Sequence, residues 1–149
     1  MKVFASTTFL GTGLTNLAEP LAVLGDLDID GVELGSTHRW QADLQKQISA
    51  HWRGDLLTHN FFPPAKDGLV LNIASADDEV RRRSIDHMKH CLAFAADIGA
   101  DLYTIHPGFL AEPTAVGRNT AKRAFDFKFD DVRTPYELAF ELMIDALKE

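Results

Sequence analysis

Residues 102–110 read LYTIHPGFL, and this stretch decides how the rest of the chain is interpreted. Four residues that favour a buried strand, 102–105, run directly into His106, and Pro107 and Gly108 then force a turn. The residue before a proline is held in an extended conformation, so we expect the strand to continue to His106. A strand that ends on an imidazole at a turn predicts a functional site at that end of the strand.

The same order of a short strand, a turn and a helix is expected four times along the chain. Strands are predicted at 2–6, 31–36, 55–60 and 102–106, and helices at 16–25, 40–50, 77–98 and 135–148. Asn16 and Glu19 have the spacing of a capping box, Pro20 fits the first helical turn, and Gly99 is suited to end the third helix. Strands that alternate with helices predict an α/β fold with a parallel sheet.

Two α/β architectures fit this order, a doubly wound open sheet and a (β/α)8 TIM barrel. The GTG at 11–13 lacks the third glycine of a dinucleotide-binding fingerprint, so it gives the open sheet little support. A barrel needs eight strand–helix units and about 250 residues. The chain has 149 residues and four units, so we expect one domain over 1–149 that forms the N-terminal half of such a barrel.

Composition limits the partners and the compartment. The net charge of −7 argues against nucleic acid as a partner, because proteins that bind duplexes usually carry a basic surplus. A single cysteine, Cys91, allows no internal disulfide and suits a reducing cytoplasm. No stretch approaches the roughly 20 apolar residues of a membrane span, and the N-terminus does not resemble a signal peptide. We therefore expect a soluble, cytoplasmic protein.

The predicted strand ends carry the residues of a candidate site. In parallel α/β folds these ends meet at one rim, which here would hold Ser6 and Thr7, then Glu33, His59 and His106. Neutral imidazole and carboxylate are ligands that Zn²⁺, Mn²⁺ and Fe²⁺ accept. The spacing predicts His59 and His106 as metal ligands or as structural histidines, and Glu33 as a substrate contact or an ion-pair partner.

The third predicted helix adds one candidate at its first turn. Arg81 lies on the side of the helix that we expect to be buried, where it could bind a substrate phosphate or carboxylate, or pair with a rim carboxylate such as Glu33. His87 and His90 project towards solvent, which argues against a second metal site. The expected buried stripe comprises Ser84, Met88, Cys91, Leu92, Ala95 and Ile98.

The connection at 107–133 is long for this fold class, and long connections are often functional. It interleaves basic residues with aromatic residues, namely Arg118, Lys122, Arg123, Lys128, Phe125, Phe127 and Phe129. This pattern fits a lid over an anionic small molecule or a contact with nucleic acid. A surface excursion with a short helix near 114–124 fits it equally well.

Several motifs in residues 56–109 together resemble one family. They are LLTHNFFPP at 56–64, NIAS at 72–75, ADIGA at 96–100 and HPG at 106–108, and DGVELG at 30–35 adds to them. The segment resembles the xylose isomerase-like TIM-barrel superfamily, which contains sugar (phosphate) isomerases and epimerases and endonuclease IV-type apurinic-site nucleases.

The resemblance implies a site that depends on a divalent metal (Mn, Zn or Mg) at the mouth of a barrel. In the nucleases the histidines that match His59 and His106 bind zinc, and in the isomerases the same strand ends line the sugar pocket. The family's later strands, which supply further Glu, Asp and His ligands, have no counterpart in this sequence.

Three functions follow as hypotheses. The first is a metal-dependent isomerase or epimerase of a small sugar or sugar phosphate, with Glu33, His59, Arg81 and His106 binding the substrate. We expect the 149 residues to carry this site incompletely and to be inactive alone. The second is an apurinic-site nuclease. The third is a half-barrel without activity of its own that associates with a second copy or with a missing C-terminal half.

Overall fold

The computed structural model describes residues 1–9, 16–35, 37–67, 69–119 and 124–149. The glycine-rich GTG segment at 11–13 lies outside these residues. The chain divides into two compact units, which comprise Met1–Lys66 with His90–Ile105, and Asp67–Lys89 with His106–Glu149. Among the described helices, none is long and apolar enough to cross a membrane.

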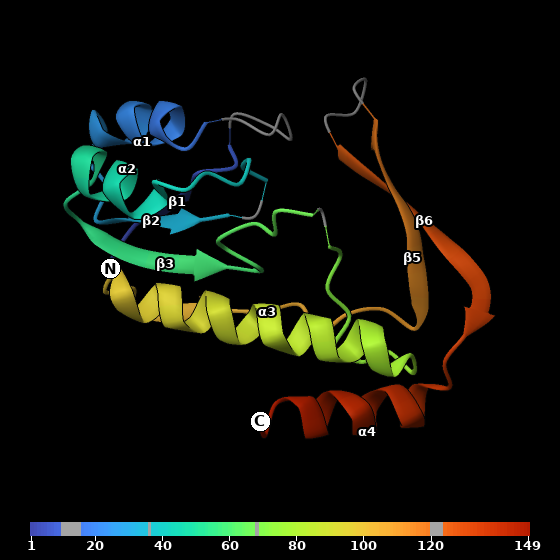
Figure 1. Ribbon diagram of the computed structural model, residues 1–149. Coiled ribbons are helices and arrows are strands. Elements are labelled where there is room, and N and C mark those ends of the chain that lie inside the picture. The colour runs from blue at the N-terminus through green and yellow to red at the C-terminus, as the bar shows by residue number, and fades with distance from the viewer. Residues whose placement is uncertain (10–15, 36, 68, 120–123) are drawn as a thin grey trace. The chain divides into compact units, whose positions relative to one another are not determined.

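The first unit contains a four-stranded sheet in the order β1-β2-β3-β4, and each pair of neighbouring strands is parallel. The strands are β1 (Phe4–Ser6), β2 (Gly31–Leu34), β3 (Asp55–His59) and β4 (Leu102–Thr104). Because each neighbouring pair is parallel, all four carboxyl ends lie at one edge of the sheet, and Figure 1 labels β1, β2 and β3. The parallel sheet confirms the α/β prediction.

The core of this unit lies between the sheet and its helices α1 (Ala18–Gly25) and α2 (Leu44–His51). Leucines of α1, among them Leu21 and Leu24, pack with Val32 and Leu34 of β2, and all four are at most 1% exposed. Pro20 lies in the first turn of α1, where its missing N–H costs no helical hydrogen bond. The Asn16 side chain accepts a hydrogen bond from the Ala18 N–H.

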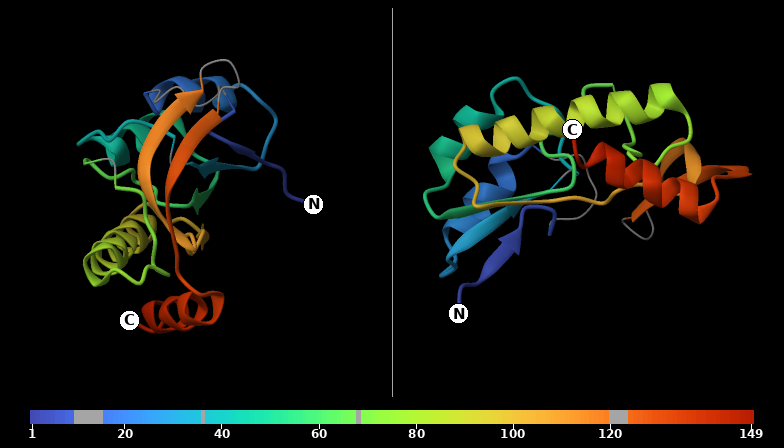
Figure 2. Two further views of the ribbon diagram at one scale, coloured as in Figure 1. Left: turned by 90° about the vertical axis from the view of Figure 1, so that its right-hand side faces the viewer. Right: turned by 90° about the horizontal axis from the view of Figure 1, so that it is seen from below.

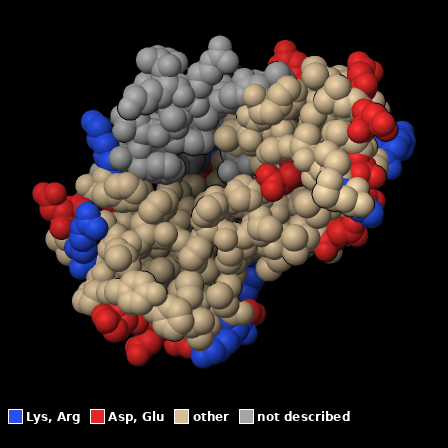
Figure 3. Space-filling view, turned by 180° about the vertical axis from the view of Figure 1, so that it is seen from behind, with Lys and Arg blue, Asp and Glu red and all other residues tan. Residues whose placement is uncertain are grey.

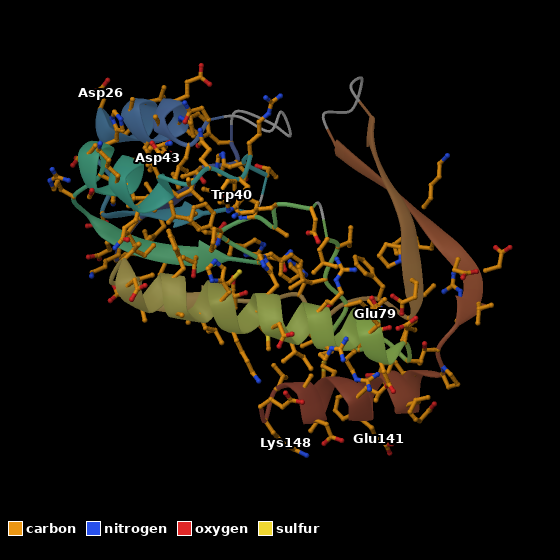
Figure 4. The ribbon with its side chains drawn as sticks, in the orientation of Figure 1. Asp26, Trp40, Asp43, Glu79, Glu141 and Lys148 are labelled. Carbon is orange, nitrogen blue, oxygen red and sulfur yellow. The ribbon has the colours of Figure 1, made fainter. Side chains whose placement is uncertain are left out.

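Helix α3 (Asp78–Asp97) contributes residues to both units. The Asp77 carboxylate accepts hydrogen bonds from the backbone N–H groups of residues 79 and 80, which satisfies donors that a helix start leaves unpaired. The first turn of α3 also carries two acidic residues, Asp78 and Glu79, and Figure 4 labels Glu79. At the other end Gly99 has a φ of +71° and the Ala100 N–H bonds to the Ala95 carbonyl, which confirms the predicted glycine cap.

The predicted buried stripe is correct at four of its six positions. Ser84, Met88, Cys91 and Ala95 are buried, whereas Ile98 is only partly buried and Leu92 is 45% exposed. A helix turns by about 100° per residue, so Leu92 points well away from its neighbour Cys91.

The second unit contains an antiparallel hairpin of β5 (Ala111–Asn119) and β6 (Ala124–Arg133), followed by α4 (Tyr136–Ala146). Figure 2 shows the two long strands of the hairpin side by side. The predicted short helix near 114–124 is therefore wrong. Phenylalanines at 125, 127 and 129 alternate with charged residues, and this period of two is typical of a strand. The side chains at 114–127 lie outside the described ones, whereas Lys128 and Phe129 are described and exposed.

Candidate functional site

The carboxyl edge of the four-stranded sheet brings together three polar side chains from three successive strands. Glu33 of β2 lies with its Oε2 atom 3.9 Å from Nδ1 of His59 of β3. The same Nδ1 lies 2.8 Å from Oγ1 of Thr104, the last residue of β4. About a third of each of the Glu33 and His59 side chains is exposed, so both can contact a ligand. We call Glu33, His59 and Thr104 the rim trio.

Strand register explains why Thr104 belongs to the rim trio. In the β3–β4 ladder His59 pairs with Thr104, and the Asn60 N–H donates to the Thr104 carbonyl. The strand therefore ends at Thr104, and the prediction that it continues to His106 is wrong. Pro107 keeps the backbone of His106 extended. A β-strand also needs hydrogen bonds to a neighbouring strand, and Pro107 does not provide them. Sequence reasoning missed Thr104 because it took the strand to end two residues later.

The rim trio is chemically suited to hold a proton or a ligand. With Nδ1 of His59 bonded to the Thr104 hydroxyl, a metal or a substrate would be bound through Nε2. The Glu33 carboxylate, with its Oε2 atom 3.9 Å from Nδ1, forms an ion pair with the ring of His59 only when that ring is protonated. A carboxylate beside an imidazole can thus accept a proton or pair with a cation.

A buried network lies behind the ends of β1 and β2. Nε2 of His38 lies 2.7 Å from Oγ1 of Thr7, and the same hydroxyl accepts a hydrogen bond from the Gly35 N–H. Thr7 and His38 are almost completely buried, so they brace the turn that follows Glu33 and do not contact solvent. A Cβ at Gly35 would come within 2.1 Å of Cγ2 of Thr8, so a larger residue there would displace the Thr8 side chain.

An aromatic side chain lies on the loop that follows β2. Trp40, which Figure 4 labels, is partly exposed. The Lys66 ammonium on the loop after β3 lies 4.0 Å from the centre of its ring. Loops after parallel strands leave the sheet at the same edge, so Trp40 is on the side of the rim trio. Its amphipathic ring in a polar loop was a sequence signal that could have identified this residue.

The other two predicted site residues, Arg81 and His106, belong to the second unit. Arg81 donates to the Ser75 carbonyl over 2.6 Å and forms an ion pair with Asp78 one turn earlier in α3. His106 is exposed and lies two residues after β4. The structure thus brings Glu33 and His59 together, and the roles of Arg81 and His106 stay predictions.

The described residues fit a metal only in part. Glu33 and His59 offer one carboxylate and one imidazole, but no group of three or more His, Cys, Asp or Glu converges within the described part of the chain. Zinc sites usually have at least three protein ligands. The rim trio can therefore supply ligands to a metal site, and further ligands would have to complete it.

Comparison with known proteins decides the family. The sequence model of the xylose isomerase-like TIM barrel family matches residues 21–147. The chain belongs to the xylose isomerase-like TIM barrel family. Its four parallel strands correspond to half of the eight strands of such a barrel. No curated protein matches the sequence.

Among solved structures, the chain is similar to the crystal structure of a D-tagatose 3-epimerase-like protein. The TM-score is 0.64 at 16% sequence identity, and the match covers 99% of this chain. It covers 46% of the other chain, so this TIM-barrel chain spans about half the length of that neighbour. In TIM-barrel enzymes the active site lies at the carboxyl ends of the strands, which is the edge that carries the rim trio.

Proposed function

We propose that this chain is part of a metal-dependent isomerase or epimerase that acts on a small hydroxy-carbonyl sugar or sugar phosphate. The observation that carries the proposal is the rim trio, a carboxylate and an imidazole 3.9 Å apart at the carboxyl edge of a parallel sheet. The family match and the similarity to an epimerase-like protein support the sugar class. The single, buried Cys91 suits a protein of the reducing cytoplasm.

The residues of the rim trio can move and hold a proton. Epimerisation removes the proton from a carbon beside a carbonyl and returns one to the opposite face, and isomerisation returns it to the neighbouring carbon. A Glu33 carboxylate can accept that proton. With Nδ1 bonded to Thr104, Nε2 of His59 is left to bind the metal. Thr104 holds the ring of His59 in place. A divalent metal, when bound, would polarise the substrate carbonyl.

Metal binding tests the ligand roles of His59 and His106. In an intact barrel we expect His59→Ala and His106→Ala each to weaken Mn²⁺ or Zn²⁺ binding at least tenfold by calorimetry. His51→Ala, at an exposed histidine in the last turn of α2, is the matched control and should leave binding unchanged. Unchanged affinity and stoichiometry in both site variants would refute the ligand assignment.

Proton exchange tests the reaction. An intact barrel that contains this chain, with Mn²⁺ and a ketose such as D-tagatose in D₂O, should replace the hydrogen beside the carbonyl with deuterium, as followed by NMR. Glu33→Gln keeps the size of the side chain but removes the base, so exchange should fall at least a hundredfold. Exchange at the unaltered rate in this variant would exclude Glu33 as the base.

Surface charge favours a sugar over nucleic acid as the substrate. The chain carries a net charge of −7, and on the face in Figure 3 the lysines and arginines lie among acidic side chains. An apurinic-site nuclease needs a basic surface for the phosphate backbone. The nuclease hypothesis therefore has less support.

We further propose that the sheet associates with additional strands. β1 and β4 are the two edges of the sheet, and Leu102 on β4 is 53% exposed. An unpaired edge with an apolar side chain is a site for strand pairing. The added strands would come from a second copy or from a C-terminal half. Light scattering of the 16.5 kDa chain should give the mass of a dimer, and a monomer at every concentration would refute self-association.

A further inference from the structure

The side chain of Asn72 holds the turn that follows His106 by two hydrogen bonds to one residue. Its Oδ1 accepts from the Phe109 N–H over 3.0 Å, and its Nδ2 donates to the Phe109 carbonyl over 3.1 Å. A carboxamide that bonds both backbone groups of one residue imitates a neighbouring strand. Phe109 therefore has little freedom to rotate about its backbone.

A second contact and a close approach fix the same turn. The Ile73 N–H donates to the Pro107 carbonyl over 3.1 Å. Gly108, between the two held residues, has a φ of +133°, and a Cβ there would come within 2.1 Å of Oδ1 of Asn72. Only glycine allows the turn to lie this close to the carboxamide. Residues 107–109, which directly follow His106, are thus held on both sides of Gly108.

Asn72 is itself anchored from two directions. Its backbone N–H donates to Oγ of Ser84 on α3 over 2.9 Å. Its Nδ2 lies 3.2 Å from each carboxylate oxygen of Glu112, which also accepts a hydrogen bond from Ser75. Asn72, Ser75 and Ser84 are completely buried. A buried carboxamide whose donor and acceptor are both satisfied has one orientation, because the reversed amide would place oxygen against oxygen.

We infer that Asn72 is a positioning residue, whose carboxamide fixes the turn at 107–109 and so sets the orientation of His106. This inference rests on the proposed function, in which His106 binds a metal or the substrate. It goes beyond that function because it assigns the control of His106 to a side chain that holds the turn after it.

The test compares three variants and one control, and it adds hydrogen exchange at Phe109 to the two measurements given below. Asn72→Ala removes both bonds to Phe109. Asn72→Asp is nearly isosteric and places a carboxylate against Glu112, and Glu112→Gln added to it removes that repulsion. Asn16→Asp makes the same chemical change at an exposed position and is the control. The measurements are ring NMR signals of His106 and His59 and calorimetric Zn²⁺ affinity.

We expect the amide hydrogen of Phe109 to exchange at least tenfold faster in Asn72→Ala. The ring signals of His106 should shift or broaden while those of His59 stay unchanged, and Zn²⁺ affinity should fall about tenfold. Asn72→Asp should affect His106 in the same way, and Glu112→Gln should partly reverse it. A uniform loss of stability would move both histidines, so the selective effect separates positioning from general support of the fold.

Unchanged His106 signals in both Asn72→Ala and Asn72→Asp would overturn the inference. If Asn72→Ala does not fold, the double variant decides, because failure of Glu112→Gln to restore the His106 signals would also overturn it. Failure of the proposed function gives a different result from failure of the inference about Asn72. In that case His106→Ala leaves Zn²⁺ affinity unchanged, although the signals of His106 still respond to Asn72.

Discussion

Replacement of Gly108 by alanine tests how closely the turn approaches Asn72. The added Cβ would lie 2.1 Å from Oδ1 and 2.9 Å from Cα of Asn72, so the backbone of one segment has to move. Overpacking of this kind costs about 1–3 kcal/mol. A φ of +133° is also strained for any residue with a Cβ, which adds about 1–3 kcal/mol.

Gly99→Ala is the matched control for this prediction. Gly99 also has a positive φ, +71°, but a Cβ there would meet nothing within 4 Å. The strain of the left-handed backbone conformation is therefore the only cost of Gly99→Ala, and it lowers the free energy of unfolding by about 1–2 kcal/mol. Both replacements stiffen the unfolded chain by a similar amount, about 0.4–1 kcal/mol, so this contribution cancels in the comparison.

Urea denaturation followed by circular dichroism measures the difference. We expect Gly108→Ala to lose at least about 1 kcal/mol more free energy of unfolding than Gly99→Ala, since only the former adds overpacking to strain. Hydrogen exchange at Phe109 should accelerate in Gly108→Ala alone. Equal destabilisation by the two substitutions would refute the close contact between Gly108 and Asn72.

Two further predictions concern the first unit. Burial raises the pKa of the Cys91 thiol to about 12 and also raises the pKa of Tyr103, so both groups hold their protons in the folded state at a pH where the unfolded chain loses them. Their contribution to the free energy of unfolding is therefore full below about pH 9. Above that pH it falls by up to about 1.4 kcal/mol per pH unit for each group. A urea midpoint that stays constant from about pH 8 to 11 would contradict this. Thr104→Val keeps the shape of the side chain but removes the hydroxyl bonded to Nδ1 of His59. The nitrogen NMR signals of that ring should therefore show a changed tautomer ratio. Thr134→Val, at a residue outside the rim trio, is the control and should leave these signals unchanged.

The sequence by itself determined the order of the elements and the class of the fold. Pro20 and Gly99 mark a helix start and a helix end through restrictions of their own backbones, and these restrictions act within a few residues. The alternation of strands and helices was enough to predict the parallel sheet that β1 to β4 form. The resemblance carried by residues 56–109 also identified the family to which the chain belongs.

The hairpin at 111–133 was accessible to sequence reasoning but was missed. Its alternating phenylalanines have the period of a strand, but the segment was interpreted as a lid, a nucleic-acid contact or a surface excursion with a short helix. The predicted fourth strand failed for a different reason. Pro107 allows His106 to be extended, but pairing with β3 decides where β4 ends, and that pairing stops at Thr104.

The tertiary structure alone decided which polar groups meet. Thr104 lies 45 residues from His59, and Glu112 lies 40 residues from Asn72, so no local pattern reports either contact. Hydrogen bonds need donor and acceptor within about 3 Å, and only the register of the sheet and the path of the loops set such distances. The sequence therefore predicted that Glu33 and His59 share a rim, whereas the partners that orient the predicted site, Thr104 and Asn72, became visible only in the folded chain.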